Sequence, residues 1–207
     1  MELTRDQLDA LTELMNIGVA KAAGVLNEML EARIHLRVPS IKTLTVRELQ
    51  QEMGSSANDK LAAVQLGFRG AFSGTSALAF PTDSASKLVS VLTEDEAQDE
   101  DPSDLDSIRV GTLTEVGNIV MNGVMGSIGN ILEERIDYAV PSYIEDTVTN
   151  LLTSNVPDTS ATVIVARTQF SIEQLQISGD VMLFFEVGSF DALLASIETM
   201  IERDSED

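Results

Sequence analysis

The sequence contains no cysteine, a single histidine and few aromatic residues. Without cysteine the chain cannot form a disulfide, a thiolate metal site or a cysteine nucleophile. One histidine cannot form a cluster of histidine ligands, and for His35 we expect a position on a strand or on the surface. Carboxylates are plentiful, so an oxygen-ligand cation site is not excluded, although no run of acidic residues has the spacing of an EF-hand loop.

Basic residues are also scarce, with 13 Lys and Arg against 34 Asp and Glu, which gives a formal net charge of −21. This balance argues against nucleic acid or an anionic membrane as the partner, because both require a cationic surface. No run of about 18 apolar residues predicts a membrane span. The acidic start of the chain is unlike a secretory signal, so we expect a cytoplasmic protein.

A charge of this size destabilises a compact state through self-repulsion in dilute salt. We therefore interpret the composition as halophile-like, since a short Debye length in concentrated salt screens the repulsion. This hypothesis predicts that the melting temperature rises between low and molar salt. If the melting temperature stays constant, the halophile hypothesis is wrong and the protein is simply acidic.

The N-terminal stretch has the pattern of one long helix from Thr4 to about Arg33. Apolar side chains recur three or four residues apart along it, and Thr4 and Gln7 have the spacing of a capping box. Gly18 and Gly24 remove side chains from the helix surface. We expect both glycines to let another element approach closely.

The remaining elements are shorter and separated by turn residues. A strand is predicted over 34–38 and ends at Pro39, 41–48 is predicted to be a weaker strand or an irregular stretch, and the polar stretch 50–58 is predicted as a loop. A β-like stretch is likewise predicted before Pro141. Further strands are predicted over 61–69, 71–80, 162–170 and 175–187, and further helices over 84–92, 107–135 and 189–202. The acidic stretch 94–103 is predicted to be a linker.

The second half of the chain repeats the first. At a constant offset of 102 residues, 13 positions are identical within a window of about 30 residues. The identical pairs include Leu11/Leu113, Glu13/Glu115, Asn16/Asn118, Gly24/Gly126 and Pro39/Pro141. A later stretch around Ser73-Gly74 matches Ser178-Gly179 at a slightly different offset. Such self-similarity indicates a duplication.

Each half is too small for a large core of its own, so the halves are expected to share one. We predict an α/β fold built from a duplicated helix–strands–helix unit, with one largely antiparallel sheet and pseudo-twofold symmetry. The whole chain, 1–207, is predicted to be a single domain. Its first repeat would span about 1–93 and its second about 104–203.

Two polar positions repeat without a packing reason. Glu13 and Asn16, like Glu115 and Asn118, are three residues apart and share one face of a helix. Asn is a poor residue for an exposed helix, because its side chain competes for the backbone. A solvated face or a structural amide would explain the pairs simply. The functional interpretation is a carboxylate that pairs with a cation beside an amide that orients water.

The motif Asp9, Glu13, Asn16 and Pro39 resembles the signature of the CheC/CheX/FliY family of CheY-phosphate phosphatases. That signature is Asp or Ser, three residues, Glu, two residues, Asn, twenty-two residues and Pro. Glu115, Asn118 and Pro141 match it in the second copy with the same spacing. Gly111 stands where the second copy should have Asp or Ser, so the first site ranks ahead of the second.

The resemblance implies a CheC-like fold and hydrolysis of the aspartyl phosphate on a CheY-type response regulator in chemotaxis. Glu13 or Glu115 would pair with the regulator's active-site lysine, and Asn16 or Asn118 would align the attacking water. Asp9 would contribute to docking. The chain would need no metal or cofactor of its own, since Mg²⁺ would arrive with the phosphorylated regulator.

Two other functions fit the same resemblance. The chain could be a non-catalytic or weakly catalytic adaptor for the phosphorylated regulator and for CheD, a receptor-modifying deamidase. It could also be a structural component of a motor switch. A hydrolase with its own nucleophile does not fit, because the sequence offers no Ser/His or Cys/His constellation.

Overall fold

The computed structural model describes residues 3–30, 34–53, 59–93, 102–155, 162–172, 175–186 and 188–206. The helices are α1 (Arg5–Leu30), α2 (Val46–Met53), α3 (Thr82–Leu92), α4 (Pro102–Ile131), α5 (Val148–Asn155) and α6 (Ser189–Glu206). The strands are β1 (Ile34–Thr45), β2 (Lys60–Gly70), β3 (Gly74–Pro81), β4 (Ile136–Tyr138), β5 (Ser142–Thr147), β6 (Thr162–Ile172) and β7 (Leu175–Phe185). Within these ranges no helix is long and apolar enough to cross a membrane.

All seven strands form one antiparallel sheet in the order β1-β6-β7-β3-β2-β4, with β5 also paired to β2. The first strand of each half pairs with the other half, because β1 lies beside β6 while β4 and β5 lie beside β2. The hairpins β2–β3 and β6–β7 meet in the middle, where β3 pairs with β7.

This exchange of strands gives the two halves a common sheet. When strands that correspond in the repeat are matched, the strand order is the same from either edge. The predicted α/β fold with one largely antiparallel, pseudo-twofold sheet is therefore confirmed. The single-domain assignment and the repeat limits stay predictions. Most of the expected linker, 94–101, lies outside the described residues, and α4 begins at Pro102, earlier than predicted.

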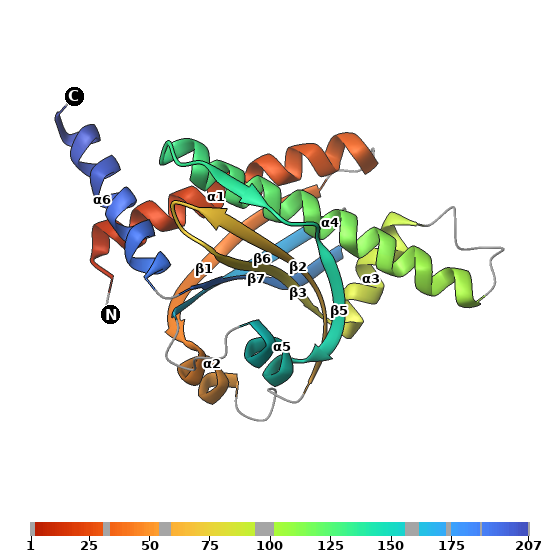
Figure 1. Ribbon diagram of the computed structural model, residues 1–207. Coiled ribbons are helices and arrows are strands. Elements are labelled where there is room, and N and C mark those ends of the chain that lie inside the picture. The colour runs from red at the N-terminus through yellow and green to blue at the C-terminus, as the bar shows by residue number, and fades with distance from the viewer. Residues whose placement is uncertain are drawn as a thin grey trace.

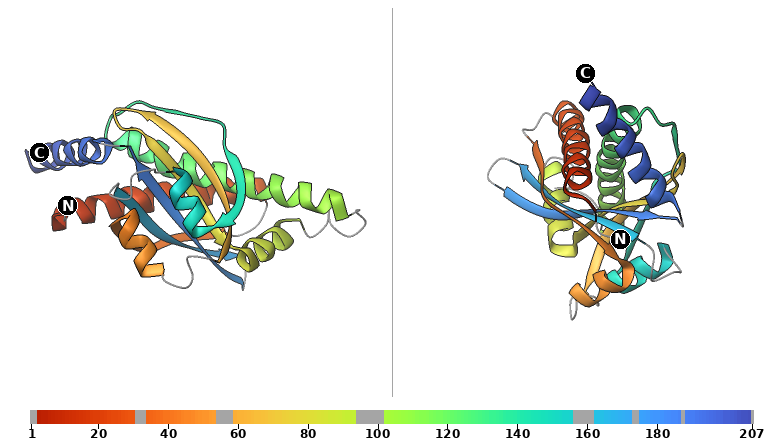
Figure 2. Two further views of the ribbon diagram at one scale, coloured as in Figure 1. Left: turned by 60° about the horizontal axis from the view of Figure 1, so that its bottom comes forward. Right: turned by 90° about the vertical axis from the view of Figure 1, so that its left-hand side faces the viewer.

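The helices cover both faces of this curled sheet (Figure 1). The long helices α1 and α4 lie side by side on one face, and α6 and α3 flank them. The short helices α2 and α5 cover the opposite face (Figure 2). The strands follow this division, since Val64 and Leu66 of β2 join the core under α1 and α4, whereas Ala63 joins the core under α2 and α5. The period of two is that of a strand buried on both faces.

The predicted end of the strand at Pro39 is wrong, because β1 continues to Thr45. The continuation covers the first part of 41–48, for which a weaker strand was one of the two expectations. The pairing of β1 with β6 shifts register between Arg37 and Ser40. Pro39 falls within this irregularity, where its missing N–H interrupts no regular ladder position, and β1 is an edge strand.

The sequence prediction also missed α2 and α5. Thr45 and Glu48 form a capping box at α2, in which the Glu48 N–H donates to Thr45 Oγ1 and the Thr45 N–H donates to Glu48 Oε2. At α5 the Asn150 N–H donates to Thr147 Oγ1. The predicted loop 50–58 therefore begins inside α2, and 54–58 lies outside the described residues.

At the start of α1 the predicted capping box is confirmed. The Thr4 N–H donates to Gln7 Oε1 at 2.9 Å and the Gln7 N–H donates to Thr4 Oγ1 at 3.2 Å. Gln7 also joins α1 to α6, because its Nε2 donates to Glu198 Oε1 at 2.7 Å. This hydrogen bond and the packing on α4 hold α1 in place from two sides.

The close approach expected of the glycines is confirmed for Gly18 and is wrong for Gly24. A Cβ built on Gly18 would lie 2.5 Å from the Cα of Val124, and one on Gly123 would lie 2.9 Å from the Cβ of Ala22. These distances place the crossing of α1 and α4 at Gly18 and Gly123. Gly24 has no neighbour within 4 Å of a built Cβ.

Candidate functional site

Glu13 and Asn16 lie on the outward face of α1. Leu11, Leu14 and Met15 are buried against the sheet, so the helical period turns the polar pair away from the core. Glu13 is exposed and Asn16 is half-buried. Asp9 is exposed one turn earlier and lies 3.9 Å from the Arg5 guanidinium. The structure thus brings these three predicted residues onto one accessible stripe.

The second pair has the same placement on α4. Glu115 is exposed and Asn118 is half-buried, while the intervening Val116 and Gly117 face the core. A Cβ built on Gly117 would collide with Val64 of β2, so this glycine lets α4 lie close to the sheet. Gly111 is exposed and has no neighbour within 4 Å of a built Cβ, and it provides no acid at the position that corresponds to Asp9.

The two pairs lie on opposite sides of the helix crossing. Because α1 and α4 run in opposite directions (Figure 1), the stretch before Gly18 and the stretch before Gly123 point to opposite ends of the helix pair. A rise of 1.5 Å per residue puts Asn16 and Asn118 roughly 10 Å apart along the helix axes. The two Glu/Asn pairs therefore lie near each other on the outward side of the helix pair.

The two asparagines differ in their local partners. Asn118 Oδ1 accepts a hydrogen bond of 2.7 Å from Asn122 Nδ2, one turn further along α4. The corresponding residue on α1 is Ala20, which has no polar side chain. Within the described part of the chain, the Asn16 side chain has no hydrogen-bond partner.

The N-terminal part of α4 is anchored to the sheet beside the second pair. Arg109 donates from Nη2 to Glu145 Oε1 of β5 at 2.7 Å, and the Tyr143 hydroxyl donates to the same carboxylate oxygen at 2.9 Å. Burial, together with the Glu145 carboxylate, raises the pKa of Tyr143 to about 12, so its hydroxyl stays a donor even in mildly alkaline solution. This network fixes the position of α4 near Glu115.

A carboxylate beside an amide defines what this face can do chemically. The carboxylate can pair with a partner's cation, while the amide both donates and accepts hydrogen bonds and can hold a water in place. Among the described residues, no group of three or more acidic or histidine side chains could hold a metal ion.

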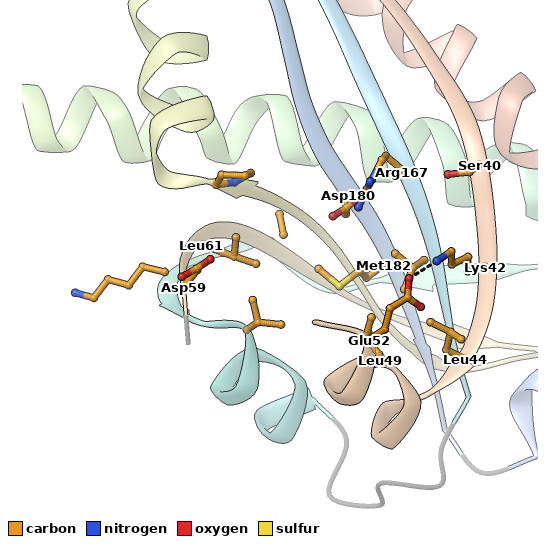
Figure 3. Close-up of a pocket in the computed structure, with 15 residues that line it drawn as sticks. Ser40, Lys42, Leu44, Leu49, Glu52, Asp59, Leu61, Arg167, Asp180 and Met182 are labelled. Carbon is orange, nitrogen blue, oxygen red and sulfur yellow. Dashed lines mark hydrogen bonds and ion pairs between the residues drawn. The ribbon is translucent and has the colours of Figure 1, made fainter. Parts of the chain in front are cut away.

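A separate cavity of about 450 Å³ lies on the opposite face of the sheet, between the strands and α2 and α5 (Figure 3). Its floor is apolar and includes Leu44, Leu61 and Met182. Ion pairs lie at its border, Lys42 with Glu52 from α2 and Arg167 with Asp180 at 3.3 Å. The cavity contains none of the predicted site residues.

Asp180 provides a test of the charge balance at this cavity. Burial raises the pKa of its carboxyl, and the Arg167 guanidinium lowers it only in part. Because the folded-state pKa is raised, ionised Asp180 lowers the stability of the fold. This loss of stability is absent when the pH is below the ordinary pKa of 3.8 and complete when the pH is above the raised pKa.

We therefore expect Asp180→Asn to increase the free energy of unfolding at pH 7 by up to about 1 kcal/mol, because the pair is partly solvated. The gain should vanish below pH ~4. Urea unfolding at both pH values measures it. Asp137→Asn removes the same charge from an exposed pair with Arg135 and serves as the control. A gain of equal size in both variants would assign the effect to net charge instead of burial.

Two protein families match parts of the chain. The family described as chemotaxis phosphatase CheX matches residues 62–166, just over half of the chain, and the CheC-like family matches residues 7–43. The chain belongs to the CheC/CheX/FliY family. The CheC-like match contains Glu13 and Asn16, and the CheX match contains Glu115 and Asn118. No curated protein sequence matches the chain.

Solved structures of the CheC/CheX/FliY family and its neighbours share this fold. Thermotoga maritima FliY is 17% identical with a TM-score of 0.76, over 97% of this chain and 100% of that one. The middle domain of Helicobacter pylori FliM is 12% identical with a TM-score of 0.66, over 94% and 99%. CheX of Borrelia burgdorferi, solved with CheY, BeF3 and Mg²⁺, is 20% identical with a TM-score of 0.53, over 84% and 99%.

Membership in the family links the chain to CheY-phosphate phosphatases and to chemotaxis. The prediction of the family from the motif is thereby confirmed. The roles of Asp9, Glu13, Asn16, Glu115 and Asn118 stay predictions. The sequence analysis did not single out Asn122, which donates a hydrogen bond to Asn118. The difference between Asn122 and Ala20 at matching positions of the repeat is visible in the sequence alone.

Proposed function

We propose that this chain hydrolyses the aspartyl phosphate of a CheY-type response regulator. The observation that carries the proposal is the double presentation of one Glu/Asn pair on the outward face of α1 and α4. Neither pair contributes to the core, since both glutamates are exposed and both asparagines are half-buried. The fold offers no packing reason for the same two polar residues in both copies.

In the proposed mechanism, the helix face lies against the regulator's active site. Glu13 or Glu115 forms an ion pair with a lysine of the regulator and fixes the orientation of the two proteins. Asn16 or Asn118 enters the site and holds a water in line with the phosphorus. An amide is too weak a base to take a proton at neutral pH, but phosphoryl transfer through a loose transition state needs position more than base strength.

The regulator brings the remaining groups. Mg²⁺ and the phosphorylated aspartate belong to it, in keeping with the CheX complex that contains CheY, BeF3 and Mg²⁺. Mg²⁺ neutralises charge on the phosphoryl oxygens, and this chain would supply the ordered water. Asp9 would add a docking contact at the first site only, because Gly111 replaces it at the second.

The decisive assay follows phosphate loss from a phosphorylated CheY-type regulator of the same cell, with Mg²⁺ and high salt. Faster loss in the presence of the chain supports the proposal. If decay is unchanged although the regulator binds, the chain acts as an adaptor or sensor, and binding of CheD would then be the next measurement.

One observation favours a second candidate, a structural component of the flagellar switch. The FliM middle domain shares the fold, and H. pylori FliM has been solved in complex with FliG. A pull-down that recovers motor proteins and no regulator would support this candidate. The two retained Glu/Asn pairs favour the phosphatase, because a purely structural surface has no need to keep the amide.

A further inference from the structure

The hydrogen bond between Asn122 and Asn118 makes the two copies of the motif unequal. Asn122 Nδ2 donates to Asn118 Oδ1 at 2.7 Å, both on the outward face of α4. The oxygen that receives this bond is the atom with which Asn118 would accept a hydrogen bond from a water. On α1 the corresponding position is Ala20, and the Asn16 oxygen faces no such donor.

The geometry of a helix adds a steric effect. Side chains lean toward the N-terminus of their helix, so the Asn122 amide leans over the turn that carries Asn118. A partner that draws Asn118 into its own active site must therefore break the hydrogen bond and move the Asn122 side chain. Asn16 meets no such obstacle, because Ala20 ends at its Cβ.

From this contact we propose that Asn122 is a positioning residue that holds Asn118 in an unproductive orientation and leaves Asn16 as the dominant site. The proposal rests on the proposed function, in which these amides orient the attacking water. It gives the inequality of the sites a cause of its own, separate from the missing acid at Gly111.

The inequality matters because the two sites compete for one partner. A compact domain of about 100 residues is about 30 Å across. The two asparagines lie roughly 10 Å apart along the helices. A regulator seated on one pair therefore also covers the other, and the freer amide determines which site is used.

The test isolates each site with a substitution and then alters the positioning residue. In an Asn16→Ala background only the second site remains. There Asn122→Ala should raise kcat/KM for dephosphorylation about three- to tenfold, the range that one net hydrogen bond supplies. In an Asn118→Ala background, Ala20→Asn should install the same contact on α1 and lower kcat/KM by a similar factor.

Asn130→Ala is the matched control. Asn130 is exposed near the end of α4, about two turns beyond Asn122, and its substitution removes the same group without touching either pair. A spectroscopic readout accompanies the kinetics. The side-chain amide resonances of Asn118 should shift in Asn122→Ala and stay in place in Asn130→Ala, whether or not a regulator is present.

The outcomes separate this proposal from the one on which it rests. An unchanged or lower kcat/KM for Asn122→Ala in the Asn16→Ala background overturns it, and a lower value would make Asn122 a residue that prepares Asn118 for catalysis. Full activity after loss of both Asn16 and Asn118 would instead refute the proposed mechanism. In that case the amide resonances alone decide whether Asn122 holds Asn118, and unshifted resonances reject the contact.

Discussion

Replacing both asparagines, Asn16→Ala with Asn118→Ala, is expected to abolish stimulated dephosphorylation while the protein stays folded. The loss of a group that positions the attacking water costs on the order of 2–4 kcal/mol of transition-state stabilisation. That range corresponds to a roughly 30- to 1000-fold fall in the stimulated rate. Release of phosphate from the regulator, at saturating concentration of the double variant, measures it.

Stability should change little in this double variant. Both asparagines are half-buried, and neither takes part in the core under α1 and α4. Alanine is also the better helix former, so the free energy of unfolding should stay within about 0.5 kcal/mol of the parent or rise. Asn130→Ala makes the same change at an exposed position of α4 and should retain full activity.

Binding separates catalysis from docking in the same experiment. Glu13 and Glu115 remain in the double variant, so it should still bind the phosphorylated regulator. If the variant binds and is inactive, the amides act in turnover. If activity is normal, the assignment of Asn16 and Asn118 is wrong. If the variant loses both activity and binding, the two pairs form a docking surface.

The repeat explains why so much of the site could be predicted from the sequence. Two copies act as an internal comparison, so Glu13/Glu115 and Asn16/Asn118 stood out against a background that has diverged. The motif spacing indicated the family, and helical periodicity placed each pair on an outward face. The repeat, the motif spacing and the periodicity are all patterns in the order of residues, which a single sequence contains in full.

What could not be predicted depends on contacts between distant segments. The exchange of β1 and β5 between the halves is a matter of strand pairing across the sheet, which no local pattern encodes. Pro39 stays within β1 because the pairing with β6 is irregular there. The helices α2 and α5 are only eight residues long. Their capping residues, Thr45 and Thr147, lie in polar stretches and do not stand out from their neighbours.

The crossing of α1 and α4 depends on Gly18, and Gly18→Ala is expected to lower the free energy of unfolding by about 1–3 kcal/mol. A Cβ at this position would lie 2.5 Å from the Cα of Val124 and 3.0 Å from the carbonyl oxygen of Gly123. Both atoms belong to the backbone, so no side-chain rotation can relieve the contact. The two helices would have to move apart, which loosens the packing around them.

Gly24→Ala is the matched control, because it adds the same methyl group to the same helix. Gly24 has no neighbour within 4 Å of a built Cβ, so the substitution should raise the free energy of unfolding by about 0.5–1 kcal/mol through helix propensity. Urea unfolding of both variants should therefore give effects of opposite sign. Two gains of similar size would mean that the helices do not meet at Gly18, and the spacing of the two Glu/Asn pairs would then have to be set elsewhere.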